Sequence, residues 1–164
     1  AFAATAQLLL ARRQTEQARA LLRELDQIDA RVDPDYAALL PSLVRVALAL
    51  DDRPLAQRLA AGVEPVAPLH EHAVASARAQ LVEAGDHADA AALYAEAAER
   101  WRSFGNVPEH AYALLGHGRC LAALRMPVAE APLREARELF ASMGYRPALA
   151  EADALLGSIE AAAL

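Results

Sequence analysis

A pattern of small and apolar residues recurs along this chain and constrains its fold more than any other feature. The four copies are Ala18, Leu22 and Leu25; Ala56, Ala60 and Val63; Ala90, Tyr94 and Ala97; and Ala129, Leu133 and Ala136. In each copy the residues stand at i, i+4 and i+7, which places them on one face of an α-helix. The leading alanines follow one another at nearly equal intervals. A repeat of roughly 34–40 residues, made of two helices, is typical of a stacked α-solenoid.

We call the interval from Ala90 to Ala129 the repeat step. At this interval the match between the two copies continues to the end of the helix: it aligns Trp101 with Phe140, Phe104 with Met143, and Gly105 with Gly144. Small residues let the two helices of a hairpin approach closely, and we expect Tyr94 to fill the space where the next unit packs. We expect Trp101 and Phe104 together to plug the end of the helix between units.

Proline indicates where the helices begin, because it is tolerated in the first turn of a helix and costly in the interior. Such prolines are Pro34, Pro54, Pro68, Pro108, Pro127 and Pro147, and the candidate caps are Asp33, Asp52 and Asp86. They predict helices that begin near residues 34, 54, 68, 86, 108, 127 and 147. Pro41 leaves two alternatives: a kinked helix from about residue 34, or a helix that begins near residue 41.

The small–aromatic–small pattern of Ala90, Tyr94 and Ala97, and next that of Ala129, Leu133 and Ala136, resembles the second helix of the tetratricopeptide (TPR) repeat. The first-helix pattern of that family is largely absent, and Leu81 stands where the family often has tyrosine. The resemblance implies an all-α fold, a right-handed α-solenoid of about four helical hairpins. The hairpins would cover about 1–30, 34–63, 67–105 and 107–144, followed by a terminal helix over 147–163, in a single domain over 1–164.

Composition excludes several classes of function. The formal net charge is −6, and no segment gathers basic residues, so direct binding to nucleic acid is not expected. The longest apolar runs, such as "LVRVALAL", are far shorter than the roughly 18–20 residues of a membrane span. Cys120 is the only cysteine, which excludes an internal disulfide and a thiolate zinc cluster and fits a cytoplasmic location.

No catalytic residue and no cofactor is expected. None of the serines lies in a glycine-flanked elbow, and the segment "GHGR" (116–119) falls inside a predicted helix without the strand that a phosphate loop needs. His117 and Cys120 are three residues apart and could both reach a transition metal. No further ligand is placed near them in the sequence, so we expect no metal and interpret the pair as structural.

A polar pattern suggests a binding face. The repeat step aligns Glu71 with His110 and Arg78 with His117, and each pair along the chain is seven residues apart. The four would form two polar ladders on neighbouring first helices, which commonly line the concave surface of a solenoid. The alternative is that these are simply the exposed positions of amphipathic helices.

The segment "LREARELFASMGYRPALAEADALL" also resembles the C-terminal repeat arrays of large bacterial signalling proteins. These include ATPase-type transcriptional regulators of the LuxR and maltose-activator kind, and adenylate cyclases. The resemblance implies a non-catalytic interaction or sensor module, expected to be part of a longer chain because the sequence lacks an initial Met. Its partner would be a protein, a peptide or another domain of the parent protein, and its cut ends would permit a homodimer. A small-molecule effector within the superhelix is the alternative, and an enzyme is less favoured.

Overall fold

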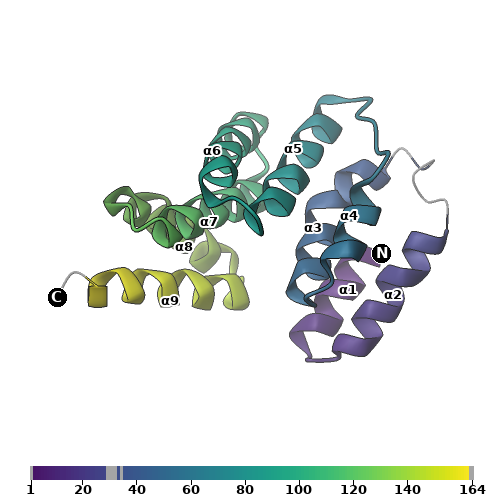
Figure 1. Cartoon of the computed structure of the whole chain (residues 1–164), viewed down its shortest axis with the longest axis horizontal. Helices are drawn as coiled ribbons and strands as arrows, with labels where there is room; N and C mark the ends of the chain where they lie inside the picture. The colour runs from purple at the N-terminus through teal and green to yellow at the C-terminus, as the bar shows by residue number, and fades with distance from the viewer. Residues whose placement is uncertain (1, 29–32, 34, 163–164) are drawn as a thin grey trace. The chain divides into compact units, whose positions relative to one another are not determined.

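The computed structural model describes residues 2–28, 33 and 35–162, and all of the regular structure in these ranges is helical (Figure 1). The helices are α1 (Phe2–Ala11), α2 (Thr15–Gln27), α3 (Tyr36–Ala49), α4 (Arg53–Ala60), α5 (Pro68–Glu83), α6 (His87–Phe104), α7 (Val107–Ala123), the short 3₁₀ helix η2 (Pro127–Ala129), α8 (Glu130–Met143) and α9 (Arg146–Ala162). The predicted all-α class is confirmed. None of these described helices has both the length and the apolar character needed to cross a membrane.

The chain forms two compact units, Ala1–Leu81 and Val82–Leu164, which we call the N-terminal and C-terminal units. In the N-terminal unit, α1 packs on α2 and α3 packs on α4, with further contacts between α1 and α3 and between α2 and α4. In the C-terminal unit, α7 packs between α6 and α8, and α9 packs on α8 and α7. The predicted single domain over 1–164 stays a prediction.

The predicted helices begin within two residues of the positions that proline and the caps indicate, except α8, which begins at Glu130 after the short helix η2. Asp52 caps α4, because its side chain accepts the backbone N–H of Leu55 at 3.1 Å. Asp86 caps α6 by accepting two backbone N–H groups of the first turn, at 2.9 and 3.0 Å. Asp33 instead accepts the N–H of Asp35, the residue before α3, and Pro34 lies outside the described residues.

Asn106 is a cap that the proline pattern missed. Its side-chain oxygen accepts the backbone N–H of Glu109 at 3.1 Å, in the first turn of α7. Asparagine is among the residues that favour this position, since its short side chain reaches the free N–H groups of the first turn. Asn106, one residue before the helix, could therefore have been recognised in the sequence as a cap.

The alternatives left open by Pro41 are decided in favour of the earlier start. Helix α3 begins at Tyr36 and includes Pro41 in its interior. Proline has no N–H, so Pro41 cannot donate the helical hydrogen bond to the carbonyl of Ala37. The carbonyl of Pro41 itself accepts a hydrogen bond from Nε2 of Gln80, at 3.2 Å.

The repeated small residues lie in the core of each unit. In the N-terminal unit, Ala18, Leu22 and Leu25 of α2 are buried together with Ala56 of α4, whereas Ala60 is only partly buried. Val63 lies beyond the end of α4 and is also partly buried. In the C-terminal unit all six members are at most 3% exposed: Ala90, Tyr94, Ala97, Ala129, Leu133 and Ala136.

The predicted plug at the end of the helix is correct for Trp101 and wrong for Phe104. Trp101 is 1% exposed and its repeat equivalent Phe140 is fully buried, whereas Phe104 is 46% exposed. Phe104 is the last residue of α6 and contacts Trp101 edge to face, with ring centroids 6.0 Å apart. It covers one edge of the tryptophan from outside the core instead of filling the core.

Candidate functional site

Four interacting side chains meet around Arg119 in the C-terminal unit, and we call this group the Arg119 cluster: Glu83, Tyr94, Arg119 and Glu151. The Nε and Nη2 groups of Arg119 donate to the two carboxylate oxygens of Glu83, the second at 2.7 Å. Nη1 of Arg119 donates to Glu151 at 2.6 Å, and the Tyr94 hydroxyl donates to Oε2 of Glu83 at 2.7 Å. A guanidinium binds a carboxylate through two parallel hydrogen bonds in the strongest geometry available to this pair.

The cluster joins four helices. Glu83 is the last residue of α5, Tyr94 lies in α6, Arg119 in α7 and Glu151 in α9. A single arginine therefore ties α7 to the end of α5 and to α9, and the Tyr94 hydroxyl adds α6 through the same carboxylate. These hydrogen bonds and ion pairs hold the packed helices together.

The protonation states in the cluster are fixed near neutral pH. Burial by itself raises the pKa of Glu83, but the hydrogen bonds and charge of Arg119 outweigh it and hold this pKa below its ordinary value. Burial and the Glu83 charge raise the pKa of Tyr94, so its hydroxyl remains a donor. Burial, together with the Glu83 charge, raises the pKa of the adjacent Cys120 thiol to about 12. None of these groups is poised to exchange a proton at neutral pH, as an acid–base catalyst would be.

Two glycines of α7 allow close helix contacts on opposite sides. A Cβ on Gly116 would lie 2.5 Å from the Tyr94 ring, and a Cβ on Gly118 would lie 2.6 Å from Cδ2 of Leu133. Residues two apart in a helix point about 200° away from each other, so Gly116 faces α6 while Gly118 faces α8. Tyr94 and Leu133 occupy equivalent positions of the repeat. The "GHGR" segment, considered in the sequence as a phosphate loop, serves helix packing.

We expect Gly118→Ala to destabilise the chain, although alanine is the better helix former. The added Cβ would overlap Leu133, which is fully buried and cannot move outward. Overpacking costs about 1–3 kcal/mol, whereas Gly→Ala in a helix gains about 1 kcal/mol. The net loss in the free energy of unfolding should be about 1 kcal/mol, measured by urea denaturation.

The matched control is Gly157→Ala in α9, where an added Cβ would meet no neighbouring helix within 4 Å. This variant keeps the gain in helix propensity without the overlap, and should be more stable than the wild type by about 0.5–1 kcal/mol. Equal stabilisation by both substitutions would contradict the close contact between α7 and α8.

The residues of the predicted binding face lie in different environments. Glu71 and Arg78 are exposed on α5, in the N-terminal unit. His110 is only 9% exposed, and its Nδ1 lies 2.8 Å from the carbonyl oxygen of Ala98 in α6. Its Nε2 lies 3.3 Å from Glu135 of α8, so the ring contributes to packing between helices. The predicted ladders each pair a residue of one unit with a residue of the other, and they stay a prediction.

The structure does not group His117 with Cys120 as possible ligands of one metal ion, although their spacing suggested this pair. His117 is partly buried in α7, and this burial lowers its pKa. The structure groups Cys120 instead with Glu83 and His87, whose ligand atoms all lie within 4.8 Å of one another. This grouping involves residues from α5, α6 and α7, so no spacing along the chain indicated it.

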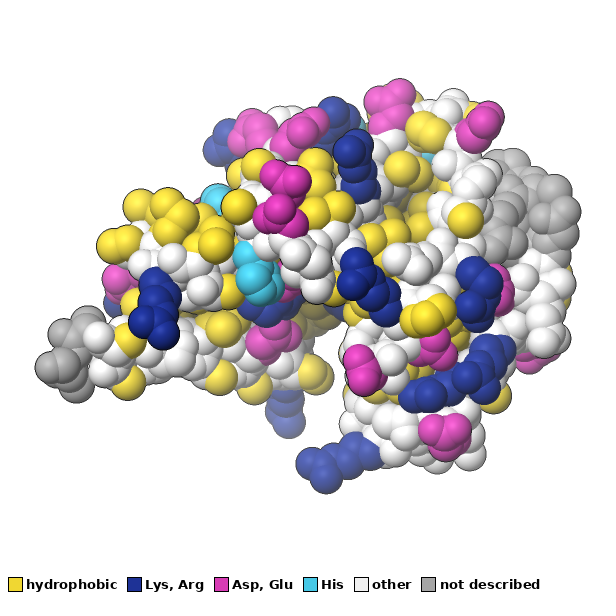
Figure 2. All heavy atoms as spheres, in the orientation of Figure 1, with side chains coloured by type: hydrophobic (Ala, Val, Ile, Leu, Met, Phe, Trp, Pro, Cys, Tyr) yellow, Lys and Arg dark blue, Asp and Glu magenta, His cyan; other side chains and the backbone are white. Residues whose placement is uncertain are grey.

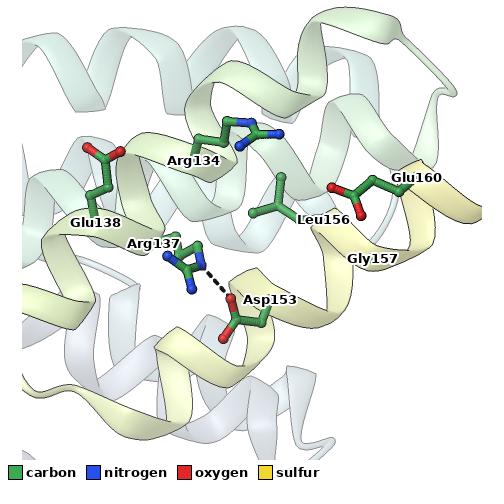
Figure 3. A pocket seen from close by; sticks show the side chains of 7 residues that line it. All are labelled: Arg134, Arg137, Glu138, Asp153, Leu156, Gly157 and Glu160. Atoms are coloured by element: carbon green, nitrogen blue, oxygen red, sulfur yellow. Dashed lines mark hydrogen bonds and ion pairs between the residues drawn. The ribbon is translucent and has the colours of Figure 1, made fainter.

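A small pocket lies between α8 and α9 (Figure 3). It has a volume of about 270 Å³, and its lining comprises Arg134, Arg137, Glu138, Asp153, Leu156, Gly157 and Glu160. Arg137 donates to Asp153 from the opposite helix at 2.5 Å, and Arg134 donates to Glu130 at 2.6 Å. Ligand pockets usually enclose about 300–1,000 Å³ and are mostly apolar. This one is smaller, and both of the arginines that line it already form ion pairs.

Comparisons with known proteins do not assign the chain to a family. No protein-family model matches it, and neither the search of curated proteins nor the search of solved structures found a match.

Proposed function

We propose that the chain is a non-catalytic repeat domain of the TPR-like, right-handed solenoid kind, which recognises a protein or peptide. It would belong to a larger bacterial regulatory protein of the cytoplasm, either transcriptional or signalling, and would pass partner binding to the other domains. This proposal extends the all-helical architecture to a specific arrangement and a role. It rests chiefly on buried residues and helix ends that recur at the repeat step.

The recurrence in the C-terminal unit supports the proposal most. Tyr94 and Leu133, one repeat step apart, are both buried in the core of this unit. Trp101 and Phe140, separated by the same step, are both buried near the end of their helices. Gly105 and Gly144 then end those helices with φ of 85° and 71°, a left-handed conformation that favours glycine. Structural equivalents at a constant step are what a repeat array requires.

The electrostatics of the chain favour a protein partner over a nucleic acid. Arginine side chains are interspersed with acidic ones on the face shown in Figure 2. The formal net charge of −6 would repel a phosphate backbone. Recognition on a surface of mixed charge is typical of protein interfaces, whose rims are polar.

A small-molecule effector is the second candidate function. The pocket between α8 and α9 is the observation in its favour, since Arg134 and Arg137 line it and the side chain of Leu156 forms an apolar part of the wall. Its volume of about 270 Å³ would admit only a small ligand, and that ligand would compete with the existing ion pairs. For this reason we favour the protein or peptide partner.

A thermal-shift screen with short peptides, nucleotides, sugars and amino acids tests the two candidates. A ligand that binds only the folded state raises its stability by about 2.7 kcal/mol at one hundred times its Kd. We expect a peptide to produce the shift, and Arg78→Ala on a first helix to weaken it. Arg100→Ala, which removes a surface arginine of second helix α6, should leave it unchanged.

Other outcomes count against the proposal. A shift produced by a small molecule and lost in Arg134→Ala would favour the effector. A peptide shift that is equally weakened by Arg78→Ala and Arg100→Ala would contradict the assignment of the binding face to the first helices.

A further inference from the structure

Three different ligand types converge where α5 ends and α6 begins. Glu83 is the last residue of α5, His87 is the first residue of α6, and Cys120 lies in α7. Their carboxylate oxygen, imidazole nitrogen and sulfur atoms all lie within 4.8 Å of one another. We propose that these three residues bind a Zn²⁺ ion.

The ligand types select the metal. Mg²⁺ and Ca²⁺ prefer oxygen ligands, whereas thiolate and imidazole suit zinc and its transition-metal neighbours. Zinc bonds of about 2.0–2.3 Å in a tetrahedral site place ligand atoms about 3.3–3.8 Å apart. Atoms within 4.8 Å of one another must therefore close by about 1 Å, and His87 is exposed, so its side chain is able to turn toward the other two.

Glu83 keeps one acceptor position for the ion. A carboxylate has about four lone-pair positions, two on each oxygen. Oε2 of Glu83 accepts from the Tyr94 hydroxyl and from Nη2 of Arg119, while Oε1 accepts from Nε of Arg119. Beside these three hydrogen bonds, one lone-pair position on Oε1 remains, and Zn²⁺ would occupy it.

The local charge is suited to this exchange. Glu83 and Glu151 carry two negative charges beside the single positive charge of Arg119, which leaves one negative charge uncompensated. When Zn²⁺ binds, the Cys120 S–H bond breaks, a Zn–S bond forms and the proton is released to solvent. The added ion and the new thiolate together contribute one positive charge, so the group becomes neutral.

Binding would stabilise the C-terminal unit. The ion would connect the end of α5, the start of α6 and the last turn of α7, with a water molecule as the fourth ligand. A ligand that binds only the folded state raises the free energy of unfolding. The metal site and the proposed partner binding are independent, because the first involves Glu83, His87 and Cys120 and the second the exposed surface of the first helices.

Titration of Co²⁺ into the reduced protein tests the proposal. We expect a thiolate-to-cobalt charge-transfer band in the near ultraviolet, saturating at one ion per chain and displaced by Zn²⁺. One proton should be released per ion, which a pH indicator measures in weak buffer. Cys120→Ser should abolish the band. His87→Ala should weaken binding by about tenfold or more, since loss of even a supporting residue around a metal costs about 10–100-fold.

His117→Ala discriminates this site from the pair that sequence spacing suggests. It removes the histidine three residues before Cys120 and should leave the cobalt affinity unchanged. Circular dichroism would establish that each variant keeps its helices, and exposed His87 gives the decisive variant if Cys120→Ser fails to fold. Absence of the band in the wild type, full affinity in His87→Ala, or loss of the band in His117→Ala would each overturn the proposal.

Discussion

Replacement of Arg119 by methionine is expected to lower the free energy of unfolding by about 2–4 kcal/mol. Removing one partner of a buried ion pair typically costs about 3–5 kcal/mol, because the other charge stays buried without compensation. The Glu83 side chain is 13% exposed and that of Arg119 is 35% exposed, so solvent screening reduces the cost. Urea denaturation in the presence of a chelator measures the effect without a contribution from bound metal.

Arg134→Met is the matched control for this substitution. Arg134 pairs with Glu130 one helical turn away, and its side chain is 59% exposed. Exposed pairs of this kind contribute little to stability, because water and salt screen them, so the control should be nearly as stable as the wild type. The double variant Glu83→Gln with Arg119→Met should lose less than the sum of the two single losses. An Arg119→Met variant as stable as the control would contradict the role of the cluster in holding the helices together.

The effect of Arg119→Met should also depend on pH. The pKa of Glu83 is lower in the folded chain than its ordinary value of 4.5. Its ion pair therefore stabilises the fold fully above that value, and the contribution is lost as the pH falls through the folded pKa. The difference between wild type and variant should be largest near neutral pH and should shrink in acid, in unfolding curves recorded from pH 7 downward.

Trp101→Ala is expected to lower the free energy of unfolding by about 3–5 kcal/mol, the usual cost of truncating a buried tryptophan. Trp101 is 1% exposed and follows the buried residues Ala90, Tyr94 and Ala97 on the same helix. The large side chain fills the last turn of α6, so its loss leaves a cavity that the rigid helix ends cannot close. Thermal and urea denaturation, with circular dichroism at each step, measure the loss.

Phe104→Ala provides the comparison, because its ring lies beside Trp101 but is 46% exposed. We expect this variant to lose less than about 1 kcal/mol, since half of the ring is already in water. Similar losses in the two variants would show that Phe104 is part of the plug after all, as the alignment with Met143 suggested.

Features that depend on neighbours along the chain were predictable from the sequence. Proline and cap residues act within one helical turn, so the helix starts near Pro54, Pro68 and Pro147 could be placed closely. The burial of the repeated small residues followed from the helical period, which puts i, i+4 and i+7 on one face. The prediction that Phe104 is buried was wrong, because alignment at the repeat step shows which positions are equivalent but not how far the core extends.

The Arg119 cluster could not be predicted in the same way. Its members lie in four helices, and no spacing along the chain brings Glu83 to Arg119 or Arg119 to Glu151. The contact depends on how closely α7 approaches its neighbours, which Gly116 and Gly118 determine. A glycine pair inside a predicted helix was the available signal, because glycine is costly there and needs a packing reason.

Duplication of one repeat tests the array most directly. A second copy of the segment 98–136, inserted after Ala136, adds one whole repeat step and joins each helix to its repeat equivalent. The control duplicates only the segment 117–136, which adds part of a unit and joins a first helix to a second helix out of phase. In a repeat array each unit contacts only its neighbours, so a whole extra unit can fold in line with the others.

The measurement is far-ultraviolet circular dichroism during thermal unfolding of both insertions. If the chain is a repeat array, the whole-unit insertion keeps the ellipticity per residue and the unfolding cooperativity of the wild type, while the partial insertion loses both. If the whole-unit insertion loses helical signal as the partial one does, the inserted segment is not an interchangeable unit, and the repeat-array account is wrong.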